Sequence, residues 1–134
     1  MKEINLTYVV DDDDIALLIA RKLLDNNPSF KYCQTFSSPQ NCLENIHQKI
    51  KTGEPLPDVI LLDINMPVMD GWEFLDKIKE IEQMKNTLIC MFTSSIDHRD
   101  RELCKAYPNI IGFITKPLMA SKLDDLILNI ENFN

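Results

Sequence analysis

Short apolar runs and segments of helical periodicity alternate along the whole chain. The apolar runs, which are bounded by turn residues, predict strands at Leu6–Val10, Phe30–Phe36, Val59–Leu62, Leu88–Phe92 and Ile110–Ile114. After four of them, apolar residues recur at intervals of three and four positions, which predicts a helix, and the segment after the fourth run predicts a more polar helix. Strands that alternate with helices indicate a parallel sheet covered on both faces, so we expect an α/β fold.

Residues that commonly cap helices stand at the start of several helical segments. They are Asp13 or Asp14 before Ile15–Asn26, Ser38 before a helix with Pro39 in its first turn, and Asp70, which Glu73 follows at the spacing of a capping box. The fourth helix is predicted at Asp97–Tyr107, where Pro108 stops it. The last helix has an apolar stripe from Leu123 to Ile130 but no clear cap, with Ser121 or the residues just before it as the options.

The composition of the strands predicts their order in the sheet. The first, third and fourth runs are nearly all apolar, as expected of central strands that are buried on both faces. The second run has Lys31 and Gln34 among its apolar residues, which is typical of an edge strand. These features fit a doubly wound sheet with strand order 2-1-3-4-5, whose switch point lies between the first and third strands.

Length and charge limit the classes of protein that the chain can represent. Its 134 residues predict one domain over residues 1–134, with no output domain. No apolar run reaches the length of a membrane helix and no signal peptide is recognisable, so we expect a cytoplasmic protein. The net charge of -7 argues against a basic binding surface, and we expect neither nucleic acid nor a membrane among its partners.

Polar side chains follow four of the five predicted strands. Asp11 and Asp12 follow the first strand, Asp63 the third, Thr93 the fourth and Lys116 the fifth. Taken singly, each has an ordinary explanation as an acidic loop, a turn residue, a local hydrogen bonder or a surface lysine. Those explanations do not account for the placement of all five at the carboxyl ends of strands around one switch point. In open α/β sheets, that edge is where ligands bind.

Carboxylates gathered in this way require a cation, because each close pair repels by roughly 4 kcal/mol at an intermediate dielectric constant. Carboxylates, a backbone carbonyl and water are ligands that suit Mg²⁺, which can keep a position for a phosphate oxygen. We therefore expect phosphoryl chemistry. With Mg²⁺ and Lys116 neutralising the transferred group, Asp63 can act as the attacking carboxylate and form an aspartyl phosphate.

Short motifs stand in a fixed order along the chain. They are Val9-Val10-Asp11-Asp12, Leu61-Leu62-Asp63, Met66-Pro67, Met69-Asp70-Gly71, Thr93-Ser94 and Lys116-Pro117. In order and spacing they match the receiver domain of bacterial two-component response regulators, which the sequence closely resembles over essentially its whole length. The resemblance implies a flavodoxin-like (βα)5 fold. It also implies a signalling switch that takes part in its own phosphorylation and dephosphorylation but is not otherwise an enzyme.

The same resemblance implies a role for each residue of the metal site. Asp63 would be the phosphoacceptor. Asp11 and Asp12 would bind Mg²⁺ together with Asp63, with Asp12 as the more direct ligand, and the backbone carbonyl of Asn65 would complete the protein ligands.

Further residues match positions that sense the phosphoryl group in the family. Thr93 and Lys116 would contact the phosphoryl oxygens, and the Lys116-Pro117 bond would be cis. Phe113 matches the switch aromatic, which is coupled to the Thr93 position. A sensor histidine kinase or a phosphotransfer protein would donate the phosphoryl group. The signal would pass to another protein through the face of the fourth helix, fifth strand and fifth helix, or by onward transfer.

Several positions depart from the common pattern of the family. Tyr107-Pro108-Asn109 replaces the usual glycine-containing connection before the fifth strand, and Ser94 stands where alanine is often found. Asn65 and Ser95 occupy positions that tune dephosphorylation. The lifetime of the phosphorylated form therefore does not follow from the resemblance.

Two other readings of the motifs remain to be distinguished. A pseudo-receiver would keep the fold as a protein-binding module without being phosphorylated. A phosphatase of the haloacid dehalogenase type also uses a strand-end aspartate with Mg²⁺, but it normally has a second acid two residues later, where this chain has Asn65.

Overall fold

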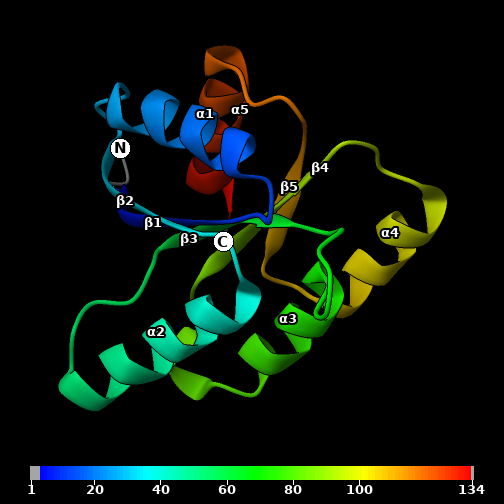
Figure 1. The fold of residues 1–134 in the computed structure, drawn as a ribbon. Helices are drawn as coiled ribbons and strands as arrows, with labels where there is room; N and C mark the ends of the chain where they lie inside the picture. Colours follow the sequence, from blue (N-terminus) through cyan, green and yellow to red (C-terminus); the bar gives the residue numbers. More distant parts are fainter. Residues whose placement is uncertain (1–3, 134) are drawn as a thin grey trace.

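The computed structural model describes residues 4–133, in which strands and helices alternate (Figure 1). The strands are β1 (Ile4–Val10), β2 (Phe30–Phe36), β3 (Val59–Asp63), β4 (Leu88–Thr93) and β5 (Ile110–Thr115). The helices are α1 (Asp14–Asp25), α2 (Pro39–Thr52), α3 (Gly71–Lys79), α4 (His98–Leu103) and α5 (Ala120–Asn132), with short 3₁₀ turns η1 (Glu82–Met84) and η2 (Cys104–Ala106).

All five strands pair in parallel in the order β2-β1-β3-β4-β5, which confirms the predicted α/β fold and strand order. Every residue of β3 and β4 is buried, whereas β2 at one edge has exposed and half-buried positions. The apolar character of a strand therefore follows its position in the sheet. Figure 1 shows α1 and α5 on one side of the sheet and α2 and α3 on the other.

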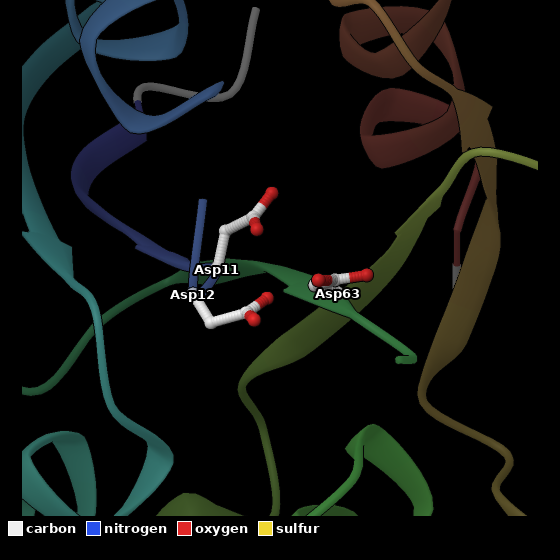
Figure 2. A group of neighbouring side chains, drawn as sticks. All are labelled: Asp11, Asp12 and Asp63. Atoms are coloured by element: carbon white, nitrogen blue, oxygen red, sulfur yellow. The ribbon is translucent and has the colours of Figure 1, made fainter. Parts of the chain in front are cut away.

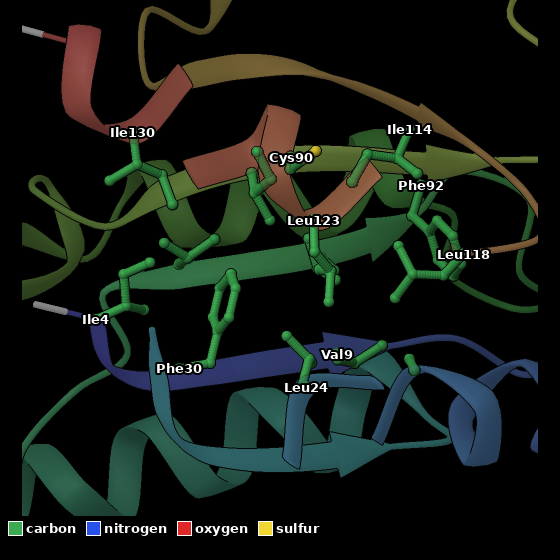
Figure 3. Packing of buried hydrophobic residues seen from close by; sticks show 14 of the residues in the cluster. Ile4, Val9, Leu24, Phe30, Cys90, Phe92, Ile114, Leu118, Leu123 and Ile130 are labelled. Carbon is green, nitrogen blue, oxygen red and sulfur yellow. The ribbon is translucent and has the colours of Figure 1, made fainter. Parts of the chain in front are cut away.

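Two apolar clusters hold these layers together. Successive residues of a strand point to opposite faces, so Val9 and Leu61 join the cluster beneath α1 and α5. Their neighbours Val10 and Leu62 join the cluster beneath α2 and α3. Figure 3 shows side chains of the first cluster, among them Leu24 of α1 and Leu123 of α5 beside residues of the central strands. Because both faces are covered, the carboxyl ends of the strands are the part of the sheet that is left to form a site.

The helices begin where the predicted caps stand. The Asp13 carboxylate accepts from the N–H groups of Ile15 and Ala16, at 2.9 and 3.4 Å. Asp70 and Glu73 form the predicted capping box of α3. For α5, whose cap does not follow from the sequence, the structure has Met119 at the N-cap, with no side-chain hydrogen bond to the first turn.

The fourth helix is shorter than its predicted range. α4 ends at Leu103, and residues Cys104–Ala106 continue as the 3₁₀ turn η2. Pro108 restricts the backbone of the residue before it and cannot continue the helical hydrogen bonding, so the last turn tightens. No residue of α4 or η2 is buried, because this segment lacks an apolar stripe. Among residues 4–133, no helix combines the length and the apolar character that crossing a membrane requires.

Candidate functional site

The carboxyl ends of four strands meet at one edge of the sheet. Asp63 is the last residue of β3 and Thr93 the last of β4, whereas Asp11 directly follows β1 and Lys116 directly follows β5. The Lys116 N–H donates to the Thr93 carbonyl at 2.7 Å, which ties the end of β5 to the end of β4. The structure thus brings together the side chains of Asp11, Asp12, Asp63 and Lys116, and it joins the backbone of Thr93 to that of Lys116.

Three carboxylates form the acidic part of this site. Asp11, Asp12 and Asp63 each offer an oxygen, and these oxygens lie within 4.8 Å of one another. Figure 2 shows the side chains of Asp11 and Asp12, at the end of β1, near the side chain of Asp63 at the end of β3. Asp11 and Asp63 are buried and Asp12 is exposed. A hard divalent cation held here would have buried carboxylates on one side and access to water on the other, which is the donor set that Mg²⁺ prefers.

Lys116 supplies positive charge next to the two buried carboxylates. Its Nζ lies 2.6 Å from Asp11 Oδ2 and 3.4 Å from Asp63 Oδ2, and its side chain is 16% exposed. Burial lowers the pKa of Lys116, but the neighbouring Asp11 and Asp63 carboxylates outweigh burial and raise the pKa above its usual value. The lysine is therefore held as an ammonium ion.

Backbone N–H groups orient the remaining carboxylate oxygens. Asp11 Oδ1 accepts from the N–H of Asp13 at 2.9 Å, and Asp63 Oδ1 accepts from the N–H of Asn65 at 3.2 Å. Burial and the Asp11 carboxylate raise the pKa of Asp63 to about 7, although Lys116 and the Asn65 N–H act in the opposite direction. The site is thus short of positive charge without a cation.

Two further residues match the family's switch positions: Thr93, at the end of β4, and Phe113, which lies on β5 two residues before its end. Thr93 is fully buried, and its hydroxyl donates to the Ser95 carbonyl at 2.9 Å. Phe113 is half-buried on β5, with the Arg101 guanidinium 6.0 Å from its ring centroid. The Lys116-Pro117 bond is cis, as the resemblance implied.

In the sequence, Gly71 stands out only as part of the Met69-Asp70-Gly71 motif, but in the structure a side chain at this position would clash with the backbone. A Cβ at this position would lie 2.7 Å from the Asp63 carbonyl oxygen and 2.9 Å from the Ile64 Cα. The Gly71 N–H donates to the Ile64 carbonyl at 2.8 Å. The start of α3 therefore packs directly against the backbone that carries Asp63. Only the three-dimensional structure reveals this contact, because hydrophobic periodicity says nothing about it.

Comparison with known proteins gives a family that fits this geometry. The family model described as the response regulator receiver domain matches residues 7–128. The chain belongs to this family. Receiver domains are the switches of two-component phosphorylation signalling, and they interact with histidine kinases or phosphotransfer proteins. They bind Mg²⁺ through an acidic pocket, and the cluster of Asp11, Asp12 and Asp63 is consistent with such a pocket.

Solved receiver domains have the same architecture. A two-component response regulator from Cytophaga hutchinsonii is 28% identical and superposes with a TM-score of 0.86, covering 98% of this chain and 99% of that one. The chemotaxis protein CheY4 of Vibrio cholerae is 25% identical with a TM-score of 0.77, covering 95% of this chain and 98% of its own. The fold is thus that of a receiver domain over nearly all of its length.

Curated relatives contain the receiver domain as part of a longer protein. The sensor histidine kinase CheAY of Helicobacter pylori is 29% identical over 122 residues, which are 91% of this chain and 14% of that protein. A protein-glutamate methylesterase/protein-glutamine glutaminase of Thiobacillus denitrificans is 30% identical over 115 residues, which are 84% of this chain and 29% of the enzyme. The chain spans less than a third of the length of these relatives.

Proposed function

We propose that this receiver domain accepts a phosphoryl group on Asp63 from a histidine kinase or a phosphotransfer protein. The observation that supports this most directly is the position of the Asp63 carboxylate. It lies at the tip of a central strand, with an oxygen within 4.8 Å of oxygens of Asp11 and Asp12, and Lys116 Nζ is 3.4 Å from its Oδ2. A carboxylate nucleophile close to a cation site and an ammonium group suits phosphoryl transfer.

Asp11, Asp12, Asp63 and the backbone carbonyl of Asn65 would hold Mg²⁺. The bound ion would neutralise charge on the phosphoryl oxygens. Asp63 would attack phosphorus through one carboxylate oxygen, so that a phosphorus–oxygen bond forms while the phosphorus–nitrogen bond to the donor histidine breaks. The imidazole leaves with the bonding electron pair. Lys116 would pair with a phosphoryl oxygen, which requires its ammonium to stay near Asp63.

The phosphoryl group would then change the position of Thr93. A phosphoryl group adds up to about two negative charges and strong acceptor oxygens. The Thr93 hydroxyl, which now bonds to Ser95, would turn to one of these oxygens and leave space for Phe113 to move inward. The altered face would be that of α4, β5 and α5. A downstream protein would bind this face, or the phosphoryl group would be passed on.

Residues 1–134 would form one receiver domain, which would act as a switch and not as an enzyme on other substrates. Cytoplasmic location and the absence of nucleic acid and membrane partners stay predictions. The alternative is a pseudo-receiver that binds proteins without being phosphorylated.

Intact-mass spectrometry after incubation with acetyl phosphate and Mg²⁺ tests the proposal. We expect one phosphoryl adduct on the wild type and none on Asp63→Asn or in the presence of a chelator. Asp14→Asn is the matched control, because it removes an exposed carboxylate of the same acidic run and should leave the adduct unchanged. No adduct on folded wild type with either acetyl phosphate or phosphoramidate, a phosphorus–nitrogen donor, would favour the pseudo-receiver.

A further inference from the structure

Lys116 has a third neighbour besides the two buried carboxylates. Its Nζ lies 5.1 Å from the centroid of the Phe92 ring. A cation over an aromatic face within about 6 Å is attracted to the negative face of the ring, and the attraction is stronger where water is excluded. Phe92 is 1% exposed, so the contact is well shielded from solvent.

The Phe92 ring packs against apolar residues of the core. Phe92 belongs to the apolar cluster beneath α1 and α5, and Figure 3 shows it beside Leu118 and Ile114. On β4, Phe92 directly precedes Thr93. The backbone carbonyl of Thr93 accepts a hydrogen bond from the backbone N–H of Lys116. The ring therefore has little freedom to move away from the ammonium group.

The lysine has room to move in one direction. A cavity of about 330 Å³ lies beside it, between the start of α1 and the residues that lead into α5. Lys116 and Phe92 line this cavity together with Ile15, Ile19, Pro117 and Leu118. A long side chain next to an open space of this size would sample several rotamers unless something attracts its end group. Asp11, Asp63 and the Phe92 ring all lie close enough to attract it.

We propose that Phe92 is a positioning residue for Lys116, and that its aromatic face holds the ammonium group where it can meet a phosphoryl group on Asp63. This inference rests on the proposed function. An aliphatic side chain at position 92 would fill the same volume but would offer no attraction to the cation. The positioning of Lys116 would therefore depend on the electron density of the Phe92 ring face and not on the size of the side chain.

Stepwise fluorination of one ring separates these two properties. We would replace Phe92 in the full chain with 4-fluoro-, 3,5-difluoro- and 3,4,5-trifluorophenylalanine. Fluorine withdraws electron density from the ring face with little change in size. The initial rate of Asp63 phosphorylation by acetyl phosphate should fall with each added fluorine, by roughly fivefold for the trifluoro ring, in keeping with the usual strength of this interaction.

The same substitutions at Phe74 are the matched control. Phe74 is also fully buried, but it lies in the other apolar cluster, away from Lys116. Its fluorination should leave the rate unchanged. Thermal unfolding of each variant would show that the proteins compared are folded.

An NMR measurement tests the contact without phosphorylation. The ring current of Phe92 should shift the ε-methylene protons of Lys116 upfield in the wild type, and the shift should be lost in Phe92→Leu. Unshifted resonances in the wild type would overturn the inference.

The kinetic outcomes distinguish the two proposals. If wild type is phosphorylated and the Phe92 series shows no graded fall in rate, the inference is wrong and the proposed function stands. If wild type forms no adduct, both the proposed function and the positioning role fail.

Discussion

The pKa of the Asp63 carboxyl group depends strongly on the groups around it. Asp63 is 4% exposed and has the Asp11 carboxylate beside it, and the ammonium group of Lys116 lies near both carboxylates. Burial and Asp11 raise the pKa of Asp63 to about 7. A carboxyl group in such a position prefers either a proton or a cation, which is a physical reason for a receiver site to bind Mg²⁺.

The raised pKa predicts how the stability of the metal-free protein changes with pH. In the unfolded chain Asp63 loses its proton near the ordinary carboxyl pKa of about 4, whereas the folded protein keeps it up to about 7. Between these values the folded state binds more protons, so the contribution of Asp63 to the free energy of unfolding should fall as pH rises through this window. Chemical denaturation in EDTA across the window measures it. Equal pH dependence in wild type and Asp63→Asn would contradict the prediction.

Gly71 leads to a second prediction at the scale of one residue. Gly71→Ala should lower the free energy of unfolding by about 1–3 kcal/mol, because the new Cβ would clash with the backbone of Asp63 and Ile64. It should also slow phosphorylation of Asp63. Gly112→Ala is the control, since its Cβ would meet only the flexible side chain of Asn129, at 3.0 Å. Urea denaturation of both variants is the measurement, and equal losses of stability would rule out the packing explanation.

At the scale of elements, α4 differs from the other helices because it is held by side chains at its surface and not by the core. Trp72 of α3 donates from Nε1 to Asp100 Oδ1 at 3.3 Å, and Asp100 also completes the capping box of α4. The rings of Trp72 and Tyr107 lie 5.6 Å apart, and the Tyr107 hydroxyl donates to Asp76 of α3. A helix attached in this way can shift without disrupting the core, which suits a part of the proposed signalling face.

Trp72→Phe tests this attachment. The substitution keeps an aromatic ring but removes the N–H that binds Asp100, an interaction that is worth about 1 kcal/mol. Amide hydrogen exchange in α4 should become roughly fivefold faster, while exchange in β3 stays unchanged. Mass spectrometry of exchanged peptides resolves the two elements. Unchanged exchange in α4 would show that the Trp72–Asp100 hydrogen bond does not hold the helix.

For the whole molecule, the three carboxylates come from the ends of β1 and β3, so a bound cation would link two central strands. A ligand that binds only the folded state stabilises all of it. Because the unfolded chain separates Asp12 from Asp63 by some fifty residues, it has no comparable site.

Mg²⁺ should therefore raise the unfolding temperature of the whole domain. At about 100 times its dissociation constant, the ion should add about 2.7 kcal/mol to the free energy of unfolding. Asp12→Asn should lose most of this gain, whereas Asp14→Asn should keep it, because residue 14 lies outside the carboxylate cluster. Differential scanning calorimetry with and without Mg²⁺ makes the comparison. A gain that survives in Asp12→Asn would mean that the ion binds elsewhere.

The sequence by itself determined the strand order, most helix starts and the set of polar residues at the strand ends. These features follow from local rules, since burial on both faces makes central strands apolar and capping requires particular residues next to a helix. The tertiary structure decided the length of α4, the need for glycine at position 71 and the contact between Phe92 and Lys116. Those features depend on side chains that are distant along the chain and meet only after packing, so no periodicity or local motif records them.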